Sequence, residues 1–450
     1  MKPLVYLLLL LSMASCRVGQ LPNNDQNADL LYSKRHYFQA ATMYKTLIKK
    51  QKNPTVKKTQ TLHLADCYRQ LNQYNQAILW YEKVVAENPD DPSFLYILAD
   101  LNMSIGNYKK AANLFETHIK EVPGAELSKE KLKRCLEAQQ LDVTGSRYKV
   151  TPLYQINTTY NEYAPIFLDD QLYFTSDRSD ATGGLRSPQT GNFYSDIYSS
   201  TREDINYDKP TKLGSQINTP LNEGANCFNA SGNVMIFTKC SGEGFDSSCV
   251  LLVSTKERGS WSKPEIIDFG ITDQYMYGHP CLSSDGKTLY FTSNIPGGYG
   301  GHDIYQSKKV NGAWSRPENL GPKINTRGDE FFPNIHKDRS LYFSSNGHSG
   351  FGALDIFVSE LKKEAWRKPK NLLPPINSGA DDINFNFIRD QNEGYFSSNR
   401  EKGQGDDLYH FTKITPPNCT LDGFAYDKKT KKTIVKSELK EINSAIKSDK

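Results

Sequence analysis

Apolar and small residues recur at helical spacing between residues 28 and 123. Three units share an aromatic residue, an alanine three positions later and a second aromatic residue four positions after that. These triplets are Tyr37, Ala40 and Tyr44; Tyr74, Ala77 and Tyr81; and Tyr108, Ala111 and Phe115. Alanine lets two helices approach closely, and an aromatic side chain on the same face fills the groove beside it. The pattern predicts three pairs of helices, followed from Glu126 by a capping helix, within a helical domain over residues 28–145.

Beyond this domain the pattern changes to that of short strands. Five related strands occur, and each is followed by a turn and a further strand such as "SDIYSS" or "HDIYQS". The five are "LYFTSDR" at Leu172, "MIFTKCS" at Met235, "LYFTSNI" at Leu289, "LYFSSNG" at Leu341 and "GYFSSNR" at Gly394. The last three steps are 54, 52 and 53 residues, and the first is lengthened by the polar insert "SDATGGLRSPQTGN". Four short strands per unit at this period predict a five-bladed β-propeller over residues 146–415.

A third repeated segment contains an aromatic residue, a proline and an Ile-Asn step. It reads "YDKPTKLGSQINT" from Tyr207, "WSRPENLGPKINT" from Trp314 and "WRKPKNLLPPINS" from Trp366, with a related segment from Trp261. Proline is tolerated only at the edge of a sheet, so we assign these segments, with their structural tryptophans, to the outer strands of the blades. Residues 148–156 form a fifth outer segment, which precedes the first blade core. Each of the five blade cores then has one outer strand if this segment pairs with the last blade and closes the ring. A six-bladed ring would need a blade that the sequence does not show.

The first residues have the pattern of a lipoprotein leader. "MKPLVYLLLLLSMASC" has a basic start, an apolar run and small residues before a cysteine. We interpret residues 1–15 as a signal peptide, Cys16 as the lipid-bearing first residue of the mature chain and residues 16–27 as a tether. The alternative is a plain signal peptide followed by an incidental cysteine. The apolar run is too short for a permanent membrane span.

Charge and cysteine usage restrict the function further. The net charge is +4, and 24% of the residues are charged, which argues against a nucleic-acid-binding protein with its basic face. The seven cysteines after Cys16 follow no zinc-ligand spacing, so neither a metal nor another cofactor is expected. Cys240 and Cys249 flank a turn-rich stretch and are placed to form a disulfide across a hairpin, which an exported compartment permits.

Familiar catalytic signatures are missing from the sequence. It contains no nucleophile elbow, P-loop or H-E-x-x-H motif, and no catalytic residue is predicted. One aspartate opens the D-I/L-Y/F strand in four blades, and this repetition indicates that each one caps a turn through backbone N–H groups. The four are Asp196, Asp303, Asp355 and Asp407.

A set of repeated carboxylates is a candidate binding site. The sixth position after the isoleucine of each step is acidic in four blades, at Glu162, Glu223, Glu330 and Asp382, and is Tyr277 in the other. The position before holds Asn161, Asn222, Asp329 and Asp381. Symmetry predicts that the four carboxylates form a partial ring at one mouth of the central channel, able to hold a cation or a basic segment. The alternative, which we favour, is that each satisfies local backbone donors or a neighbouring arginine such as Arg178 or Arg400.

Several of these features resemble known families. The helical units resemble tetratricopeptide repeats, and the "LYFxS…DIY" blades resemble the PD40 class of WD40-like repeats. Residues 418–450 resemble the first strands of a carboxypeptidase-regulatory-like β-sandwich and stop short of a complete one. The order of these parts is a lipoprotein leader, helical repeats, a propeller and the start of a sandwich. This order resembles that of the PorE-type lipoproteins of the Bacteroidota, which are associated with type IX secretion and envelope anchoring.

The resemblance implies an outer-membrane lipoprotein. Cys16 is followed by "RVGQLPNN", without an acidic run that resembles a surface-export signal, so we expect the chain to face the periplasm. Proteins of this type usually continue into an OmpA-like domain that binds peptidoglycan. The sequence holds no such domain, and direct peptidoglycan binding is not expected of it.

These features predict an α + β multidomain chain: a tetratricopeptide solenoid, a five-bladed propeller and the start of a sandwich. We expect a non-enzymatic scaffold that binds protein partners through the concave face of the solenoid and through the propeller. One alternative is a propeller that binds a glycan or a peptide at its channel mouth. A less favoured alternative is an enzyme of the five-bladed glycosidase type, which needs carboxylates in unlike environments, whereas the repeated acids are alike.

Overall fold

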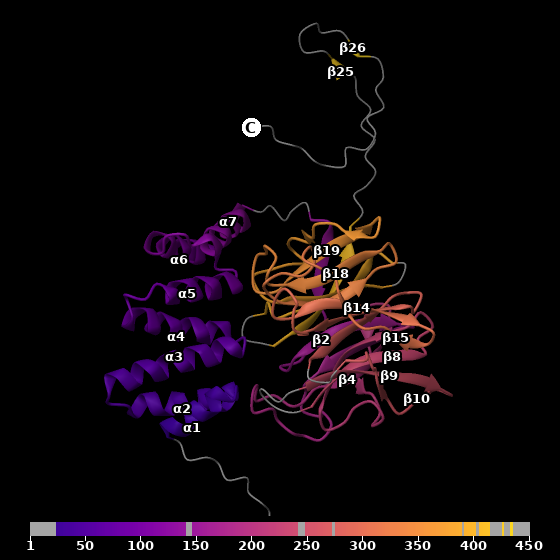
Figure 1. The fold of residues 1–450 in the computed structure, drawn as a ribbon, viewed down its shortest axis with the longest axis horizontal. Helices are drawn as coiled ribbons and strands as arrows, with labels where there is room; N and C mark the ends of the chain where they lie inside the picture. The colour runs from indigo at the N-terminus through magenta and orange to yellow at the C-terminus, as the bar shows by residue number, and fades with distance from the viewer. Residues whose placement is uncertain are drawn as a thin grey trace, which may run out of the picture.

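A column of helices stands beside a β-propeller in the computed structural model (Figure 1). The structure describes residues 24–140, 146–241, 248–271, 275–388, 391–401, 405–414, 425–426 and 433–434. The predicted α + β fold class, with a helical repeat domain before a five-bladed propeller, is confirmed.

The helical domain consists of three helix pairs and a last single helix. Its elements are α1 (Asp25–Ser33), α2 (Tyr37–Lys50), α3 (Pro54–Gln70), α4 (Tyr74–Glu87), α5 (Ser93–Ser104), α6 (Tyr108–Glu121) and α7 (Glu126–Gln140). The repeated alanines and second aromatics of α2, α4 and α6 are all buried, because they face the partner helices. Asn72 and Gly106 take positive φ values of 54° and 71° in the turns that lead into α4 and α6, a conformation that these residue types tolerate.

Each propeller blade is an antiparallel sheet whose strands follow one another from the channel outwards. The inner strands are β2 (Glu162–Leu168), β7 (Asn222–Phe228), β12 (Tyr277–Leu282), β17 (Glu330–Ile335) and β22 (Asp382–Phe387). The second strands are β3 (Gln171–Ser176), β8 (Val234–Ser241), β13 (Thr288–Ser293), β18 (Ser340–Ser345) and β23 (Glu393–Ser398). The third strands are β4 (Asp196–Glu203), β9 (Ser248–Glu257), β14 (Asp303–Val310), β19 (Asp355–Lys362) and β24 (Asp407–Lys413).

The outer strand of four blades is split into two short pieces by the proline of the repeated segment. The pieces are β5 (Asn206–Tyr207) and β6 (Thr211–Lys212), β10 (Ser260–Trp261) and β11 (Glu265–Ile266), β15 (Ala313–Trp314) and β16 (Glu318–Asn319), and β20 (Ala365–Trp366) and β21 (Lys370–Asn371). Proline has no N–H to give to the ladder, and a serine of the third strand bridges the gap. In β14, for example, the Ser307 hydroxyl donates to the Ser315 carbonyl at 2.7 Å.

The fifth blade takes its outer strand from the start of the propeller. β1 (Tyr148–Pro152) pairs antiparallel with β24, and Val150 lies opposite Phe411. The last sheet therefore has the order β1-β24-β23-β22, and this pairing closes the ring.

The helical domain contacts one face of the propeller through the turns of its repeats. The Tyr74 hydroxyl donates to Asp381 at 2.9 Å, and the Phe38 N–H donates to the Gln189 carbonyl at 2.9 Å. Gln189 belongs to the polar insert of the first blade, so this insert reaches the first helical repeat. From α7, Arg134 bonds to Ser349.

Some predicted segments lie wholly or largely outside the described residues. They include residues 1–15, Cys16 and the tether up to residue 23, whereas residues 25–27, predicted as tether, already belong to α1. Within residues 418–450 the structure describes two short strands, β25 (Ala425–Tyr426) and β26 (Thr433–Ile434), which pair with each other. Among the described helices, none combines the length and the apolar character needed to cross a membrane.

Deleting residues 148–152 from the full chain is expected to open the propeller. The deletion removes the partner of β24 and leaves an unpaired sheet edge, which favours aggregation. We expect a melting temperature lower by at least about 5 °C, or loss of the monodisperse species in size-exclusion chromatography. Unchanged melting and elution would contradict ring closure through β1.

Candidate functional site

The four repeated carboxylates are completely buried, each with an exposed fraction of 0%. Each stands at the start of an inner strand and accepts the backbone N–H and the hydroxyl of the Thr or Ser four residues earlier. For Glu330 these two bonds, from Thr326, are 2.8 and 2.6 Å long. The side chains are therefore used inside the turn that enters each blade, and a ligand in the channel does not reach them.

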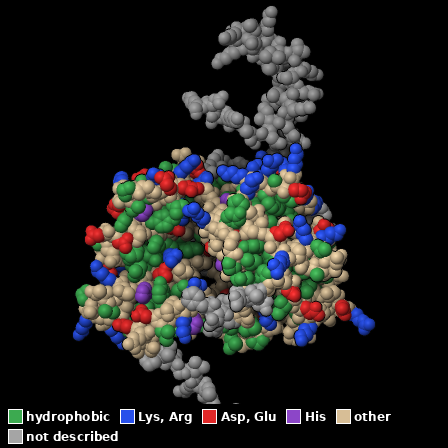
Figure 2. All heavy atoms as spheres, in the orientation of Figure 1, with side chains coloured by type: hydrophobic (Ala, Val, Ile, Leu, Met, Phe, Trp, Pro, Cys, Tyr) green, Lys and Arg blue, Asp and Glu red, His purple; other side chains and the backbone are tan. Residues whose placement is uncertain are grey.

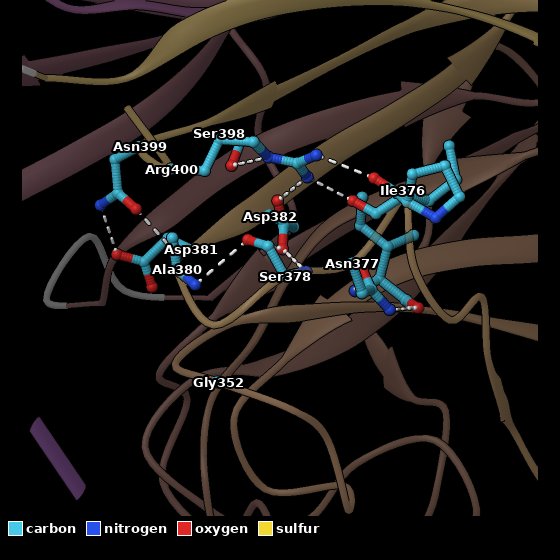
Figure 3. Close-up of polar contacts among 12 residues, drawn as sticks. Gly352, Ile376, Asn377, Ser378, Ala380, Asp381, Asp382, Ser398, Asn399 and Arg400 are labelled. Atoms are coloured by element: carbon cyan, nitrogen blue, oxygen red, sulfur yellow. Dashed lines mark hydrogen bonds and ion pairs between the residues drawn. The ribbon is translucent and has the colours of Figure 1, made fainter. Parts of the chain in front are cut away.

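The charges of these carboxylates are compensated in different ways. Glu162 pairs with Arg178 at 3.0 Å and Glu223 with Lys239 at 3.1 Å, and Arg400 points at Asp382 (Figure 3). Glu330 instead accepts the Ser345 hydroxyl at 2.7 Å, and no cation of the described residues is ion-paired with it. Burial raises the pKa of Glu330, although the Thr326 and Ser345 donors oppose this rise.

The asparagine of the Ile-Asn step connects neighbouring parts of the propeller, a role that was not predicted from the sequence. In each of four steps its side-chain amide binds both the N–H and the C=O of one residue of a third strand. Asn325, for example, takes the Ile304 N–H at 2.8 Å and its carbonyl at 3.0 Å. Its recurrence directly after the isoleucine in four steps was the available signal, because an amide that recurs in a repeat points to backbone hydrogen bonding.

The repeated aspartates lie in the turns before the third strands. Asp196, Asp303 and Asp355 accept the N–H groups of Thr182, Tyr299 and Phe351 at 2.7, 2.6 and 2.9 Å. The turn before Asp407 includes residues 402–404, which lie outside the described part of the chain.

The tryptophans of the outer strands pack between blades. Trp314 contacts the cluster that joins the second and third blades. Trp366 is buried against the third blade, and Trp261 contacts the cluster formed with the first. Each indole thus fills the space toward the preceding blade.

The structure joins Cys240 and Cys249 in a disulfide with an S–S length of 2.05 Å, between β8 and β9. Four further cysteines, at positions 67, 135, 227 and 281, are free and buried. Within the described ranges, no group of three or more His, Cys, Asp or Glu side chains is arranged to hold a metal ion.

The central channel is filled by side chains rather than open. At equivalent positions the inner strands bulge through a residue with positive φ, at Ala164, Ala225, His279, Phe332 and Asn384. The rings of His279 and Phe332 stack with centroids 3.9 Å apart, and burial lowers the pKa of His279 to about 3. The cavity left among these residues has a volume of about 20 Å³, enough for a water molecule but not for a substrate.

A much larger hollow lies between the helical turns and the propeller face that they contact. We call it the chamber, and its volume is about 1140 Å³. It is lined by residues 70–76, 104–106 and Tyr108 of the helical domain, by loops of the first and fifth blades, and by the segment that connects the fourth blade to the fifth. Figure 2 shows a hollow between the two parts of the molecule. The chamber was not predicted, because it needs both domains in place.

Three aspartates lie close together on the propeller, and two of them, Asp177 and Asp406, line the chamber. Asp177 accepts from Asn161 and Asn192, and Asp381 accepts from Tyr74 and Asn399. Figure 3 shows Asn399 turned toward Asp381. The carboxylate of Asp406 has no hydrogen-bond or ion-pair partner among the described residues. Burial, with the neighbouring charges of Asp381 and Asp177, raises the pKa of Asp406 to about 7.

A family model described as "Anaphase-promoting complex, cyclosome, subunit 3" matches residues 33–118 and 70–138. It covers only the helical part of the chain and supports the tetratricopeptide-like assignment. No curated protein matches the chain.

Several solved structures are similar to parts of the chain. The TPR-containing domain of a Plasmodium falciparum FK506-binding protein is 20% identical, with a TM-score of 0.23, over 26% of this chain and 85% of that one. An α-L-arabinofuranosidase from Lactobacillus brevis is 11% identical, with a TM-score of 0.37, over 62% and 94%. A gluconolactonase from Xanthomonas campestris is 11% identical, with a TM-score of 0.34, over 59% and 89%. Likeness at this level carries no information about function.

Asp382→Asn is expected to destabilise the protein more than Glu330→Gln does. The first change leaves the guanidinium of Arg400 without its buried carboxylate, at a cost of about 3–5 kcal/mol. The second removes hydrogen-bond acceptors but leaves no cation without its partner, at a cost of about 1–3 kcal/mol. Urea unfolding of the full-length variants measures the difference, and equal losses would contradict the unequal charge compensation.

Calcium is expected to leave the melting temperature of the wild-type protein unchanged, because the four carboxylates are inaccessible and locally bonded. The matched variant is Glu223→Gln combined with Glu330→Gln. A calcium-dependent rise in the wild type that disappears in this double variant would show that the carboxylates act as a shared site.

Asp406→Asn is expected to flatten the pH dependence of stability. The pKa of Asp406 is about 7 in the folded protein and about 3.9 in an unfolded chain. Between these values the folded state keeps a proton that the unfolded state has lost, so this group makes stability fall as the pH rises from about 4 to 7. Thermal melts at pH 5 and pH 8 should show a smaller fall in the variant than in the wild type. Asp204→Asn, in an exposed turn of the same propeller, is the control; identical profiles for all three proteins would refute the assignment.

Proposed function

We propose that this protein is a non-enzymatic, lipid-anchored scaffold on the periplasmic side of the outer membrane. It assembles protein partners, in type IX secretion or in the organisation of the cell envelope. The helical domain and the propeller are its two interaction modules, and Cys16 is its membrane anchor.

The observation that carries the proposal is that the repeated carboxylates are all buried and all bonded within a turn of the fold. A glycosidase-type site needs two acids in unlike environments, open to substrate. Glu162, Glu223, Glu330 and Asp382 are instead all completely buried and bonded to the same kind of turn. These carboxylates stabilise the propeller ring, and a rigid ring can serve as a binding surface for other proteins.

The arrangement of the helical domain also supports assembly with other proteins. It contacts the propeller through Phe38 and Tyr74, at the starts of α2 and α4, and through Arg134 of α7. Tetratricopeptide and propeller domains generally offer surfaces to protein partners. The lipid anchor and the secretion role rest on the leader sequence and on the domain order.

Cys16→Ala is expected to release the protein from the membrane fraction or to block its maturation. Two or more acyl chains make membrane attachment stable, and the variant has no site for them. Membrane fractionation and mass measurement of the mature N-terminus test this, with Cys419→Ala as the control that keeps its anchor. Membrane retention with normal processing of Cys16→Ala would refute the lipoprotein assignment.

The scaffold role is tested by isolating the intact lipoprotein from envelopes and identifying co-purifying proteins by mass spectrometry. We expect a reproducible set of envelope or secretion proteins that is lost when the helical domain is deleted. Recovery of the lipoprotein without partners, together with hydrolysis of a glycoside by the purified protein, would overturn the proposal in favour of an enzyme.

A further inference from the structure

The chamber has the size of a ligand site and is open to solvent along its helical wall. Its volume is about 1140 Å³, slightly above the usual range of about 300–1,000 Å³ for small-molecule sites. It has one wall from the helical domain and one from the propeller, so the docking of the two domains creates it.

The helical wall is rich in carboxamides that have no partner. They are solvent-exposed and lie at the end of α3, in the turn that follows and in the first turn of α4, at Gln70, Asn72, Gln73, Asn75 and Gln76. Within the described ranges, the side-chain amide of each one lacks a hydrogen-bond partner. The equivalent turn of the first repeat carries Lys34, Arg35 and His36 instead. Each carboxamide offers donors and an acceptor without a net charge.

Aromatic rings line the chamber beside these amides. The rings of Tyr160 and Phe193, from the first blade, lie 6.2 Å apart and are half-buried. Tyr108, at the start of α6, lines the chamber from the helical side. The hydroxyls of Tyr108 and Tyr160 have no hydrogen-bond partner in the part of the chain that the structure describes. A tyrosine in this state offers a flat apolar face and a polar tip to the same ligand.

Asp406 departs from the blade repeat. The residue just before the first aspartate of the third strand is Ser195, His302 or Leu354 in other blades. An acid at this position is therefore not required by the fold. Its carboxylate has no partner among the described residues, whereas donors satisfy the neighbouring Asp177 and Asp381.

We propose that the chamber binds a short neutral oligosaccharide. Sugar hydroxyls both donate and accept hydrogen bonds, which matches the exposed carboxamides and the carboxyl of Asp406, and the flat faces of sugar rings match the rings of Tyr108 and Tyr160. An apolar ligand would displace water from the exposed carboxamides and from Asp406 without replacing the hydrogen bonds of that water. An anion would meet Asp177, Asp406 and Glu401, while Arg400, the one cation that lines the described chamber, is bonded to Asp382 and to backbone carbonyls.

This inference goes beyond the scaffold role and does not depend on the membrane anchor. The test uses the purified mature lipoprotein in a detergent without a sugar headgroup. The probes are neutral oligosaccharides of four to six units, namely cello-, xylo-, malto- and N-acetylated chito-oligosaccharides, titrated by calorimetry. We expect saturable binding of at least one of them at a single site.

Two variants examine opposite walls of the chamber. Asp406→Asn, and Gln73→Ala combined with Gln76→Ala, should each weaken binding by about tenfold, since each removes one or two hydrogen bonds to the ligand. Asp406→Asn should also be at least as heat-stable as the wild type at pH 8, which separates lost binding from lost folding. Asp204→Asn and Lys34→Ala, outside the chamber lining, should bind normally.

Three results would overturn the inference. They are no binding of any oligosaccharide, binding that both chamber variants leave unchanged, and binding only of a lysine- and arginine-rich peptide in a manner that requires Asp406. Because partner recovery from envelopes is measured separately, failure of oligosaccharide binding with partners still recovered would overturn the chamber site and leave the scaffold role standing.

Discussion

The propeller depends on how each Ile-Asn step holds one blade to the next. Neighbouring sheets share no strand ladder, so their register rests on side-chain packing and on these steps. The asparagine ties the step to the third strand of the blade it leaves. The acid that follows braces the turn, and its own N–H donates to a carbonyl just before that third strand, as Glu223 does to Ser195 at 2.9 Å. The same bonds join Asn157 and Glu162 to the fifth blade, so the ring closes with the chemistry that builds it.

The helical domain contacts the propeller next to one of these Ile-Asn steps. Asp381 stands directly before the bracing acid Asp382 and accepts the hydroxyl of Tyr74. The polar insert of the first blade reaches Phe38 with the Gln189 carbonyl. The helices therefore cover the propeller face at which the inner strands begin. A ligand of this face must fit between two domains, and a displacement of one domain would change its site.

Departures from the repeat indicate where specific function lies. Residues that recur from blade to blade have a structural role, as the completely buried acids of four blades show. Asp406, where other blades have Ser195, His302 or Leu354, has no such structural task. The insert that carries Gln189 and the carboxamide-rich turn at residues 70–76 are further departures. These three features meet at the chamber, which is why we place a binding site there and not in the filled channel.

The sequence by itself determined the elements and their number. Alanine and aromatic spacing specified the helix pairs, the strand period specified five blades, and the prolines marked the outer strands, because these are properties of a local repeat. Only the tertiary structure decided that Glu330 and its counterparts turn into their own blades, that His279 and Phe332 fill the channel, and that a chamber exists. The repeat spacing in the sequence gives the position of a residue within its blade but not the direction in which its side chain points. Domain docking depends on contacts such as that of Tyr74 with Asp381, 307 residues apart, which no local pattern encodes.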